Sequence, residues 1–495
     1  MGELDMCGIC GYYGFDVNKL SLPIPRIKHR GPDDYGMAAD SCFKFGHTRL
    51  SIIDVENGQQ PMYNEDHSLC IVFNGEIYNH CKIRADLKKN HRFKTTSDTE
   101  VILYLYEEEG LAGLKKLDGM FALAIAAPEE LVLARDPVGI KPLYLQNDKN
   151  RIYFASEIKA CNSDSNICEF PPGTIFSTKY GYQTFYKIPS NYNQNLSWDE
   201  CLSGLRTRLK EAVVKRLMAD VPLGSFLSGG LDSSLITALI KESQNELHTF
   251  SVSMPESNDR QYAWSVSRHL GTIHHEIIVT PKELWNAIPE VIYYLESYDR
   301  SLVRSAVANY FLAKYAATEV KVVLTGEGAD ELFAGYAYLN RFHDKDLLQR
   351  ELWQTIKELH YTNLQRVDRM TMAHGLEARV PFLDQQVIAW AMQIPPEFKR
   401  SSTGISKWCL REAFRSDKLL PDEIFDRKKE KFAEGTGIAT VLAELAEIKV
   451  SDGSYLWELA QGTSLRSKEE YYYFQIFVAY FGREQALHLV GRSKS

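Results

Sequence analysis

The sequence has little that would place the chain in a membrane, on nucleic acid or outside the cell. No apolar run approaches the roughly 18 residues that a membrane-spanning helix needs. The first residues, MGELDMCGIC, have neither a basic segment nor the long apolar core of a secretory signal. The net charge of -8 and the pI near 6.0 argue against a nucleic-acid-binding surface. We therefore expect a cytoplasmic protein that binds neither membranes nor nucleic acid.

Cysteine is scarce for a chain of 495 residues, which is long enough for several domains. An odd number of scattered cysteines in a large chain is typical of reduced thiols rather than a disulfide framework. The nine cysteines stand at positions 7, 10, 42, 70, 81, 161, 168, 201 and 409.

Cys7 and Cys10 form the single C-x-x-C of the chain. A zinc site would need a second close pair, whereas Cys42 stands alone. A redox pair should open a helix, but the following residues, GYYGF, resemble a strand. A small buried residue is the plain structural alternative. The remaining hypothesis is a nucleophile activated by its own α-amine, whose pKa of about 7.7–8.0 lets it accept the thiol proton.

That hypothesis requires Cys7 to be the first residue of the working enzyme, because an amide nitrogen is not basic. Met6 before a small residue suits removal of an initiator methionine. We expect Met1–Asp5 to be an upstream extension or a cloning remnant, with a self-cleaved propeptide as the alternative.

Four further motifs follow Cys7 in order, and with it they resemble the class II glutamine amidotransferases, which are N-terminal-nucleophile hydrolases. The glutaminase half of asparagine synthetase B is the most similar member. The motifs are HRGPD at 29–33, GHTRLSIID at 46–54, FNGEIYN at 73–79 and TSDTE at 96–100.

The residue types suit hydrolysis of glutamine. The Asn74 side chain and the Gly75 backbone N–H can stabilise a tetrahedral oxyanion. Arg49 offers a guanidinium fork for the substrate carboxylate, and Asp98 and Glu76 offer acceptors for its ammonium group. Taken alone, Asn-Gly is usually a hairpin turn and an arginine a surface ion pair. The resemblance adds the backbone beside Arg49 to the glutamine site: Leu50, Ser51, Ile52 and Ile53.

Strand-like segments continue to about Ile188 and predict stacked sheets in the first half. Examples are 117–125 and 131–136, joined by a Pro-Glu-Glu turn. We expect an αββα N-terminal-nucleophile hydrolase sandwich over 7–188, a polar linker over 189–197 and a second domain over 198–495 that begins with a helix running to about Ala219.

The second half contains a glycine-rich loop between a strand and a helix, LSGGLDSS at 227–234. It lacks the Walker A pattern and resembles the pyrophosphate loop of ATP enzymes that form acyl-adenylates. Backbone N–H groups at a helix start can hold phosphate oxygens, and Asp232 could bind Mg²⁺. A capped glycine-rich turn is the alternative. The expected ATP contacts are Leu227, Ser228, Gly229, Gly230, Asp232, Ser233, Ser234, Val252, Thr325 and Gly326.

A second acidic loop, TGEGADELF at 325–333, follows a buried strand-like segment. Strand carboxyl ends bind ligands in α/β folds, and Asp330 is a natural second metal ligand. By resemblance, Glu327 acts when β-aspartyl-AMP forms and reacts with ammonia. Related β-lactam synthetases carry Tyr there and lack the glutaminase cysteine, whereas this chain keeps both Glu327 and Cys7. We therefore expect a parallel-sheet α/β synthetase domain.

The resemblance extends to about Gly437 and assigns roles to two basic residues, Lys429 and Arg304. Lys429, in RKKEKF, stands at the catalytic lysine of the family, although a basic run alone is more often a solvated helix face. Arg304 is expected to contact the anionic acceptor. Ser301 and Leu302 stand where family members carry two adjacent threonines, which bears on the acceptor acid.

The resemblance implies a glutamine-dependent asparagine synthetase. It would use glutamine, aspartate and ATP with Mg²⁺, send ammonia between two sites through a sheltered passage, and release AMP and pyrophosphate. A homodimer is left open. The alternatives are an amidotransferase for another carboxylate, such as a sugar acid or antibiotic precursor, and a catalytically silent relative.

Overall fold

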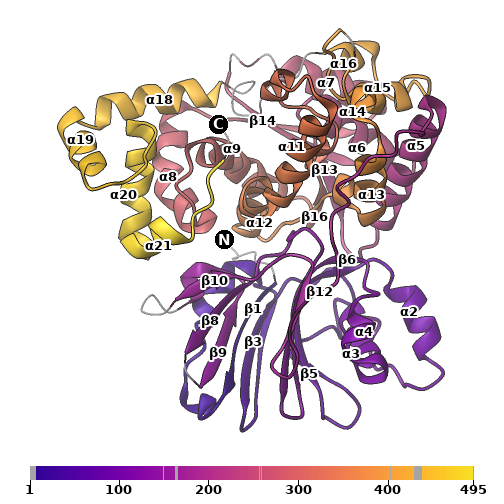
Figure 1. The fold of residues 1–495 in the computed structure, drawn as a ribbon, viewed down its shortest axis with the longest axis vertical. Helices are drawn as coiled ribbons and strands as arrows, with labels where there is room; N and C mark the ends of the chain where they lie inside the picture. Colours follow the sequence, from indigo (N-terminus) through magenta and orange to yellow (C-terminus); the bar gives the residue numbers. More distant parts are fainter. Residues whose placement is uncertain are drawn as a thin grey trace.

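The computed structural model describes residues 7–148, 150–161, 166–255, 257, 259–401, 403–427 and 437–493. Figure 1 shows two bodies stacked along the long axis: the amino-terminal half, in indigo and purple, lies below the carboxy-terminal half, in magenta to yellow.

The amino-terminal half is built on two stacked antiparallel sheets, as the sequence predicts (Figure 1). The first sheet has the order β10-β8-β9-β1-β3-β2 and the second β12-β11-β7-β6-β5-β4. The strands of the first sheet are β1 (Gly8–Gly14), β2 (Asp34–Ala39), β3 (Phe43–Arg49), β8 (Tyr144–Asp148), β9 (Arg151–Ala155) and β10 (Ile167–Glu169). Those of the second are β4 (Met62–Tyr63), β5 (Cys70–Ile77), β6 (Gly119–Ala127), β7 (Glu130–Arg135), β11 (Thr174–Ser177) and β12 (Gly181–Thr184).

Strand β6 explains how the sandwich is packed. Side chains alternate across a strand, so Ala122 and Ala124 face the core between the sheets, where Ile9 and Phe45 also lie. Leu123 faces the opposite side, toward the helices that cover this sheet. The apolar run of β6 is thus buried on both faces, which is why it does not alternate with polar residues.

Helices flank the sandwich. The longest, α3, packs against β5 on the outer face of the second sheet, and α1 contacts β1 and β3 of the first. The helices of this half are α1 (Ile24–Ile27), α2 (His80–Leu87), α3 (Asp98–Glu109) and α4 (Leu111–Leu114). Short 3₁₀ turns occur at η1 (Val17–Lys19), η2 (Lys28–Arg30) and η3 (Ile158–Ala160).

The carboxy-terminal half contains a five-stranded parallel sheet of order β15-β14-β13-β16-β17, surrounded by helices (Figure 1). The sequence predicts this parallel α/β domain. The strands are β13 (Leu223–Phe226), β14 (His248–Ser253), β15 (Ile273–Ile278), β16 (Val322–Leu324) and β17 (Glu377–Arg379).

The helices of this half fall into two groups. Those around the sheet are α5 (Trp198–Lys215), α6 (Leu231–Lys241), α7 (Asp259–Leu270), α8 (Pro281–Leu295), α9 (Arg300–Ala316), α10 (Ala329–Leu332), α11 (Lys345–Lys357), α12 (Asn363–Met372), α13 (Gln385–Gln393), α14 (Pro396–Lys399), α15 (Trp408–Arg415) and α16 (Asp422–Asp426), with 3₁₀ turns η4 (Ala337–Arg341), η5 (Leu359–Tyr361) and η6 (Pro381–Leu383). The carboxy-terminal group, which packs on α8 and α9, is α18 (Ile438–Lys449), α19 (Asp452–Ala460), α20 (Lys468–Phe481) and α21 (Arg483–His488).

Helix α5 begins where the sequence predicts, because Ser197 and Glu200 form a reciprocal capping box. It ends at Lys215 rather than near Ala219. The chain turns there because the Arg216 guanidinium is held by Asp384 at 2.8 Å and the Asp220 N–H donates to the Ile52 carbonyl of the other half.

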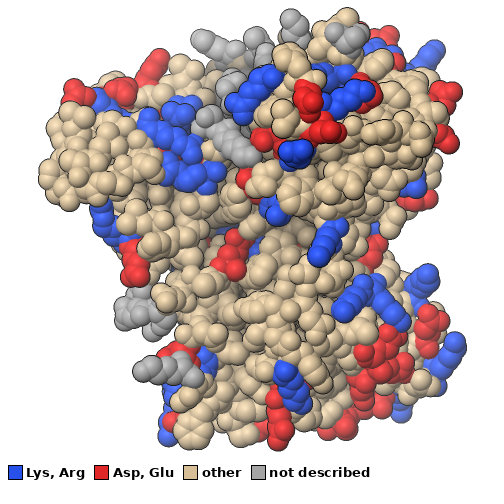
Figure 2. Space-filling model, in the orientation of Figure 1, with Lys and Arg blue, Asp and Glu red and all other residues tan. Residues whose placement is uncertain are grey.

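The surface carries both signs of charge. Figure 2 shows basic and acidic side chains interspersed on the face in view, with acidic ones concentrated at the lower right, where Figure 1 places α3 and α4. Among the described residues, no helix combines the length and the apolar character needed to cross a bilayer.

Candidate functional site

A cavity of about 30 Å³ opens beside Cys7; we call it the Cys7 cavity. The predicted glutamine-site residues line it, with the exception of Ser51, whose N–H donates to Asp33. The lining comprises Cys7, Arg49, Leu50, Ile52, Ile53, Gly58, Gln60, Phe73, Asn74, Gly75, Glu76, Ser97, Asp98, Thr99 and Glu377.

The Cys7 thiol lies at the start of β1. Its sulfur accepts a hydrogen bond from the Leu50 N–H at 3.2 Å. Burial raises the pKa of the thiol to about 12, and the Leu50 hydrogen bond opposes that rise only in part. A thiol with this pKa is protonated near neutral pH, so it needs a base to become a nucleophile.

Asn74 and Gly75, the residues predicted to form an oxyanion site, both line the Cys7 cavity. Asn74 is 1% exposed, and its side-chain nitrogen has no hydrogen-bond partner among the described residues. A buried amide donor left unsatisfied is costly unless a ligand completes it. Gly75 has φ +150°, and a Cβ there would lie 2.0 Å from the Met120 carbonyl, so only glycine fits.

The charged residues of the lining are one basic residue, Arg49, and three acidic ones, Glu76, Asp98 and Glu377. The Arg49 guanidinium is oriented by the carbonyls of Asp54 and Val55, at 2.6 and 3.0 Å. Burial raises the pKa of Asp98 to about 6 and raises the pKa of Glu76. Such shifts show carboxylates that lack full compensation within the protein, and a bound ammonium group would supply it.

One lining residue, Glu377, belongs to the other half of the chain. It extends from β17, where it accepts hydrogen bonds from Arg379 at 2.9 Å and Lys141 at 3.2 Å. Arg379 in turn approaches Glu76 at 3.5 Å. The Cys7 cavity is therefore completed by the carboxy-terminal half.

The glycine-rich loop has the predicted order of strand, loop and helix: β13, residues 227–230 and α6. The Ser233 hydroxyl accepts from the Ser228 N–H at 3.1 Å and lies 3.0 Å from the Ser228 hydroxyl. Gly326 touches this loop so closely that a Cβ would lie 2.8 Å from the backbone of Asp232. The two predicted loops therefore form one surface at the carboxyl ends of β13 and β16.

This surface faces a cavity of about 160 Å³, which we call the Asp232 cavity. Among the predicted ATP contacts, Gly229 and Ser234 belong to the loop and helix but do not line it. The lining comprises Phe226, Leu227, Ser228, Gly230, Leu231, Asp232, Ser233, Phe250, Ser251, Val252, Asp259, Asn309, Leu312, Thr325, Gly326, Glu327, Asp330, Arg366, Val367, Lys407, Arg411 and Arg427.

Lys407 joins the two predicted metal ligands. Its ammonium group lies 2.5 Å from both the Asp232 and the Asp330 carboxylates, and its side chain is 2% exposed. The backbone of Lys407 is left-handed, with φ 57°. Gly335 leaves room for the Asp330 carboxylate, since a Cβ at position 335 would lie 1.9 Å from Asp330 Oδ1. The Lys407 ammonium group thus occupies the position between the two carboxylates, whose hard oxygen atoms are the type of ligand that Mg²⁺ prefers.

Basic side chains surround the rest of the cavity. Arg366 forms an ion pair with Glu327, and Arg427 pairs with Asp259 and stacks on Tyr262, with 4.1 Å between the guanidinium carbon and the ring centre. These groups suit an anionic ligand such as a polyphosphate.

Arg304, the predicted acceptor contact, does not line the Asp232 cavity. Arg304 forms a two-pronged ion pair with Glu469 of α20, at 2.8 and 2.5 Å. Lys429 lies outside the described residues. Both roles stay predictions.

Sequence reasoning missed Arg366, Lys407, Arg411, Arg427 and Glu377. Glu377 lies in LEARVPFLD at 376–384, and Arg427 begins RKKEKF. Both segments resemble the family, but the resemblance gave neither residue a role. Lys407 carried no signal, because neither its left-handed backbone nor its distant acidic partners can be read locally.

The chain matches two protein families in succession. Residues 6–179 match the glutamine amidotransferase domain, and residues 204–345 and 340–493 match asparagine synthase.

The relatives that match over nearly the whole length include plant proteins. The chain is 39% identical to asparagine synthetase [glutamine-hydrolyzing] 2 of Oryza sativa subsp. japonica over 515 residues, covering 97% of this chain and 86% of the relative. It is 40% identical to asparagine synthetase [glutamine-hydrolyzing] 3 of Arabidopsis thaliana over 517 residues, covering 97% and 88%. It is 38% identical to asparagine synthetase [glutamine-hydrolyzing] of Zea mays over 516 residues, covering 98% and 88%.

Proposed function

This chain belongs to the asparagine synthase family, and we propose that it is a glutamine-hydrolysing asparagine synthetase that works through its two cavities. Glutamine is hydrolysed in the Cys7 cavity. Aspartate is activated with ATP and amidated in the Asp232 cavity.

In the Cys7 cavity, Arg49 binds the glutamine carboxylate, and Asp98 and Glu76 bind its ammonium group. The Cys7 sulfur attacks the side-chain amide carbon, forming a C–S bond and a tetrahedral oxyanion. Asn74 and the Gly75 N–H stabilise that oxyanion. The C–N bond then breaks with protonation of the leaving nitrogen, releasing ammonia, and water hydrolyses the thioester to glutamate.

The base for this reaction is the α-amine of Cys7. The raised pKa of the buried thiol makes a neighbouring base necessary, and an amine of pKa about 7.7–8.0 can accept its proton. This assignment requires Cys7 to begin the active chain.

In the Asp232 cavity, the backbone and hydroxyl groups of 228–233 bind the polyphosphate, and Leu227 and Val252 pack on the adenine. Asp232 and Asp330 would hold Mg²⁺, which would neutralise phosphate charge when bound. The aspartate side-chain carboxylate forms a bond to the α-phosphorus, and pyrophosphate leaves. Ammonia then attacks the β-aspartyl-AMP carbonyl, AMP leaves, and Glu327 is placed to accept the proton that ammonia loses.

The contact between the halves supports transfer of ammonia within the molecule. Cys7 and Leu50 pack in the same apolar cluster as Met120, and that cluster continues to Leu227 and Leu231 of the nucleotide loop. An apolar path would keep ammonia unprotonated, whereas in water near neutral pH it becomes ammonium. We propose that ammonia crosses here.

The observation that carries the proposal is the convergence of the predicted glutamine residues on one cavity and the predicted ATP loops on another. Pyrophosphate release measured with and without each substrate tests it. We expect release only when ATP, Mg²⁺ and aspartate are all present. Release with another carboxylate but not with aspartate would contradict the asparagine assignment, and no release with any acid would indicate a silent relative.

The proposal also covers the domain boundaries and the cellular compartment. The segment between β12 and α5 contains no helix or strand, which supports 189–197 as the linker between a glutaminase domain at 7–188 and a synthetase domain at 198–495. All nine cysteines are free thiols, which supports a reducing compartment such as the cytoplasm.

A further inference from the structure

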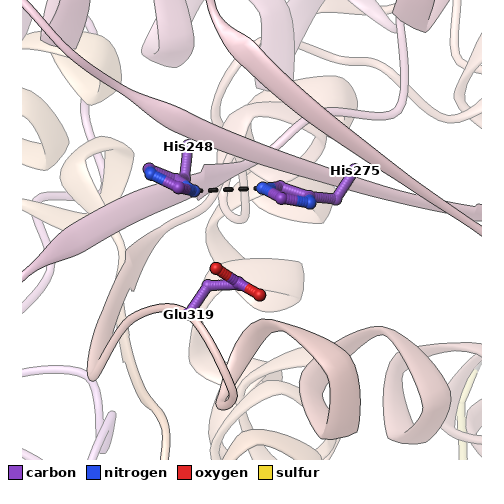
Figure 3. Close-up of side chains that lie close together, drawn as sticks. All are labelled: His248, His275 and Glu319. Atoms are coloured by element: carbon purple, nitrogen blue, oxygen red, sulfur yellow. Dashed lines mark hydrogen bonds between the residues drawn. The ribbon is translucent and has the colours of Figure 1, made fainter.

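Two histidines and a glutamate meet at the amino edge of the parallel sheet, away from both cavities. Figure 3 shows the imidazoles of His248 and His275 facing each other, with Glu319 pointing toward them from the turn after α9. His248 Nδ1 lies 3.0 Å from His275 Nε2. One ligand atom from each of the three residues lies within 4.8 Å of the other two.

The distance between the two nitrogens is close to that between two ligands of a single metal ion. Two nitrogens bound tetrahedrally at about 2.0–2.1 Å would lie about 3.3 Å apart. In the metal-free protein, one proton shared between the facing nitrogens fills the gap. A divalent ion can replace that proton with a small displacement of the side chains.

The outer nitrogen of each imidazole also has an oxygen nearby. The Tyr315 hydroxyl lies 3.3 Å from His275 Nδ1, and a Glu246 carboxylate oxygen lies 3.9 Å from His248 Nε2. Histidines that bind metals usually place an oxygen acceptor at the nitrogen that does not bind, which fixes the tautomer and the ring orientation. These contacts leave the inner nitrogens as the metal-binding pair.

The two histidines are held by paired strands, and the site remains accessible. β14 and β15 pair in parallel register from His248 to Ser253, and the ring of Phe250 stacks on His275 with 5.1 Å between ring centres. The His248 side chain is 26% exposed, and Glu319 is exposed. A metal ion can therefore enter without unfolding the sheet.

We propose that His248, His275 and Glu319 form a binding site for a divalent transition metal ion, represented by Zn²⁺, with water as the fourth ligand. Two imidazoles and one carboxylate select this class of ion over Mg²⁺ and Ca²⁺, which prefer all-oxygen sites. The ion links β14 and β15 to the end of α9. The same elements carry Val252 of β14 and Asn309 of α9, which line the Asp232 cavity, so metal binding stabilises the synthetase half.

The test uses the full chain, stripped with a chelator and kept in excess Mg²⁺, which competes with the probe for the acidic pair in the Asp232 cavity. Titration with Co²⁺ and Zn²⁺, followed by absorption spectroscopy and calorimetry, should show one site per chain whose Co²⁺ spectrum lacks thiolate charge-transfer bands. Zn²⁺ should raise the thermal midpoint, because the assembled site of the folded state binds it more tightly than the separate side chains of the unfolded chain do.

The variants His248→Gln and His275→Gln should abolish this binding and the thermal shift. Glu319→Gln changes an exposed side chain, leaves the fold intact and should weaken binding about tenfold or more. His269→Gln, an exposed histidine on α7, is the matched control and should bind as the parent does.

The proposal would be overturned by no bound ion in the parent, by unchanged binding in both histidine variants that still fold, or by unchanged binding in Glu319→Gln. A Co²⁺ complex with thiolate bands that is lost in Cys81→Ser would also overturn it and would assign the metal to Cys81 and His80, whose sulfur and Nε2 lie 3.5 Å apart.

Discussion

Arg30 and Asp368 form a two-pronged ion pair between the two halves of the chain, with Nη1 2.9 Å from Oδ2 and Nη2 3.2 Å from Oδ1. The third nitrogen of Arg30, Nε, donates to the Cys7 carbonyl at 3.2 Å. Asp368 lies on α12, which also carries Arg366, the partner of Glu327. Helix α12 therefore contacts both Arg30, which holds the Cys7 carbonyl, and Glu327, which lines the Asp232 cavity.

The first prediction concerns the ion pair between Arg30 and Asp368. Asp368→Asn should lower kcat/KM for glutamine hydrolysis about tenfold, because Arg30 loses a charged partner and holds the Cys7 carbonyl less well. Synthesis from added ammonium should change less than about twofold. Asp86→Asn, at an exposed position on α2, is the control. Equal losses in both activities would mean that Asp368 matters to the fold of α12 rather than to Cys7.

The second prediction concerns variants in the Asp232 cavity, which should lose one of the two activities and keep the other. Glu327→Gln or Asp232→Ala should abolish asparagine synthesis, because the first removes the proton acceptor and the second a phosphate-site carboxylate. Glutamine hydrolysis should remain, since neither residue lines the Cys7 cavity. Glutamate and pyrophosphate formation measured on the same sample decide this, and simultaneous loss of both products would contradict the division into two sites.

The third prediction tests the nucleophile. Cys7→Ala should remove glutamine use and spare synthesis from ammonium salt, because no other thiol lines the cavity. Cys10→Ala is the matched control from the same strand, where the thiol is fully buried, and it should retain glutamine hydrolysis. Inactivity of the Cys10 variant, with its fold intact, would reopen the redox interpretation of the C-x-x-C.

The fourth prediction concerns pH. Burial raises the pKa of Asp98 to about 6. Below that pH the carboxylate gains a proton and loses its attraction for the glutamine ammonium group, so the KM for glutamine should rise about tenfold per pH unit. Protonation of the Cys7 α-amine, whose pKa is about 7.7–8.0, lowers kcat separately over the same range. Glutaminase kinetics from about pH 5 to about pH 8 measure this. Asp98→Asn should show the high KM throughout, and a variant that keeps the transition would remove Asp98 as its cause.

The fifth prediction concerns the amino group of Cys7. A chain that keeps a peptide bond before Cys7 should lack glutamine hydrolysis, because an amide nitrogen cannot accept the thiol proton. A chain that begins at Cys7 should be active, and both should make asparagine from ammonium. Intact mass and glutaminase rate are measured on each sample. A full rate with Met1–Met6 attached would refute the N-terminal-nucleophile mechanism.

The sequence by itself determined the local parts of this protein. The run of β6, the capping box at Ser197 and the order of strand, loop and helix around LSGGLDSS depend on neighbours in the chain, whose preferences add up within one element. The motifs of the Cys7 cavity were also readable, because each is a short segment in which residue type and spacing carry the chemistry.

Only the tertiary structure decided which distant groups complete each site. Glu377 reaches the Cys7 cavity from the other half, Arg30 meets Asp368 across 338 positions, and Lys407 meets Asp232 across 175. These pairs form because whole sheets pack against each other and exclude water, so that buried charges must find partners wherever the fold places them. Local periodicity carries no record of that packing.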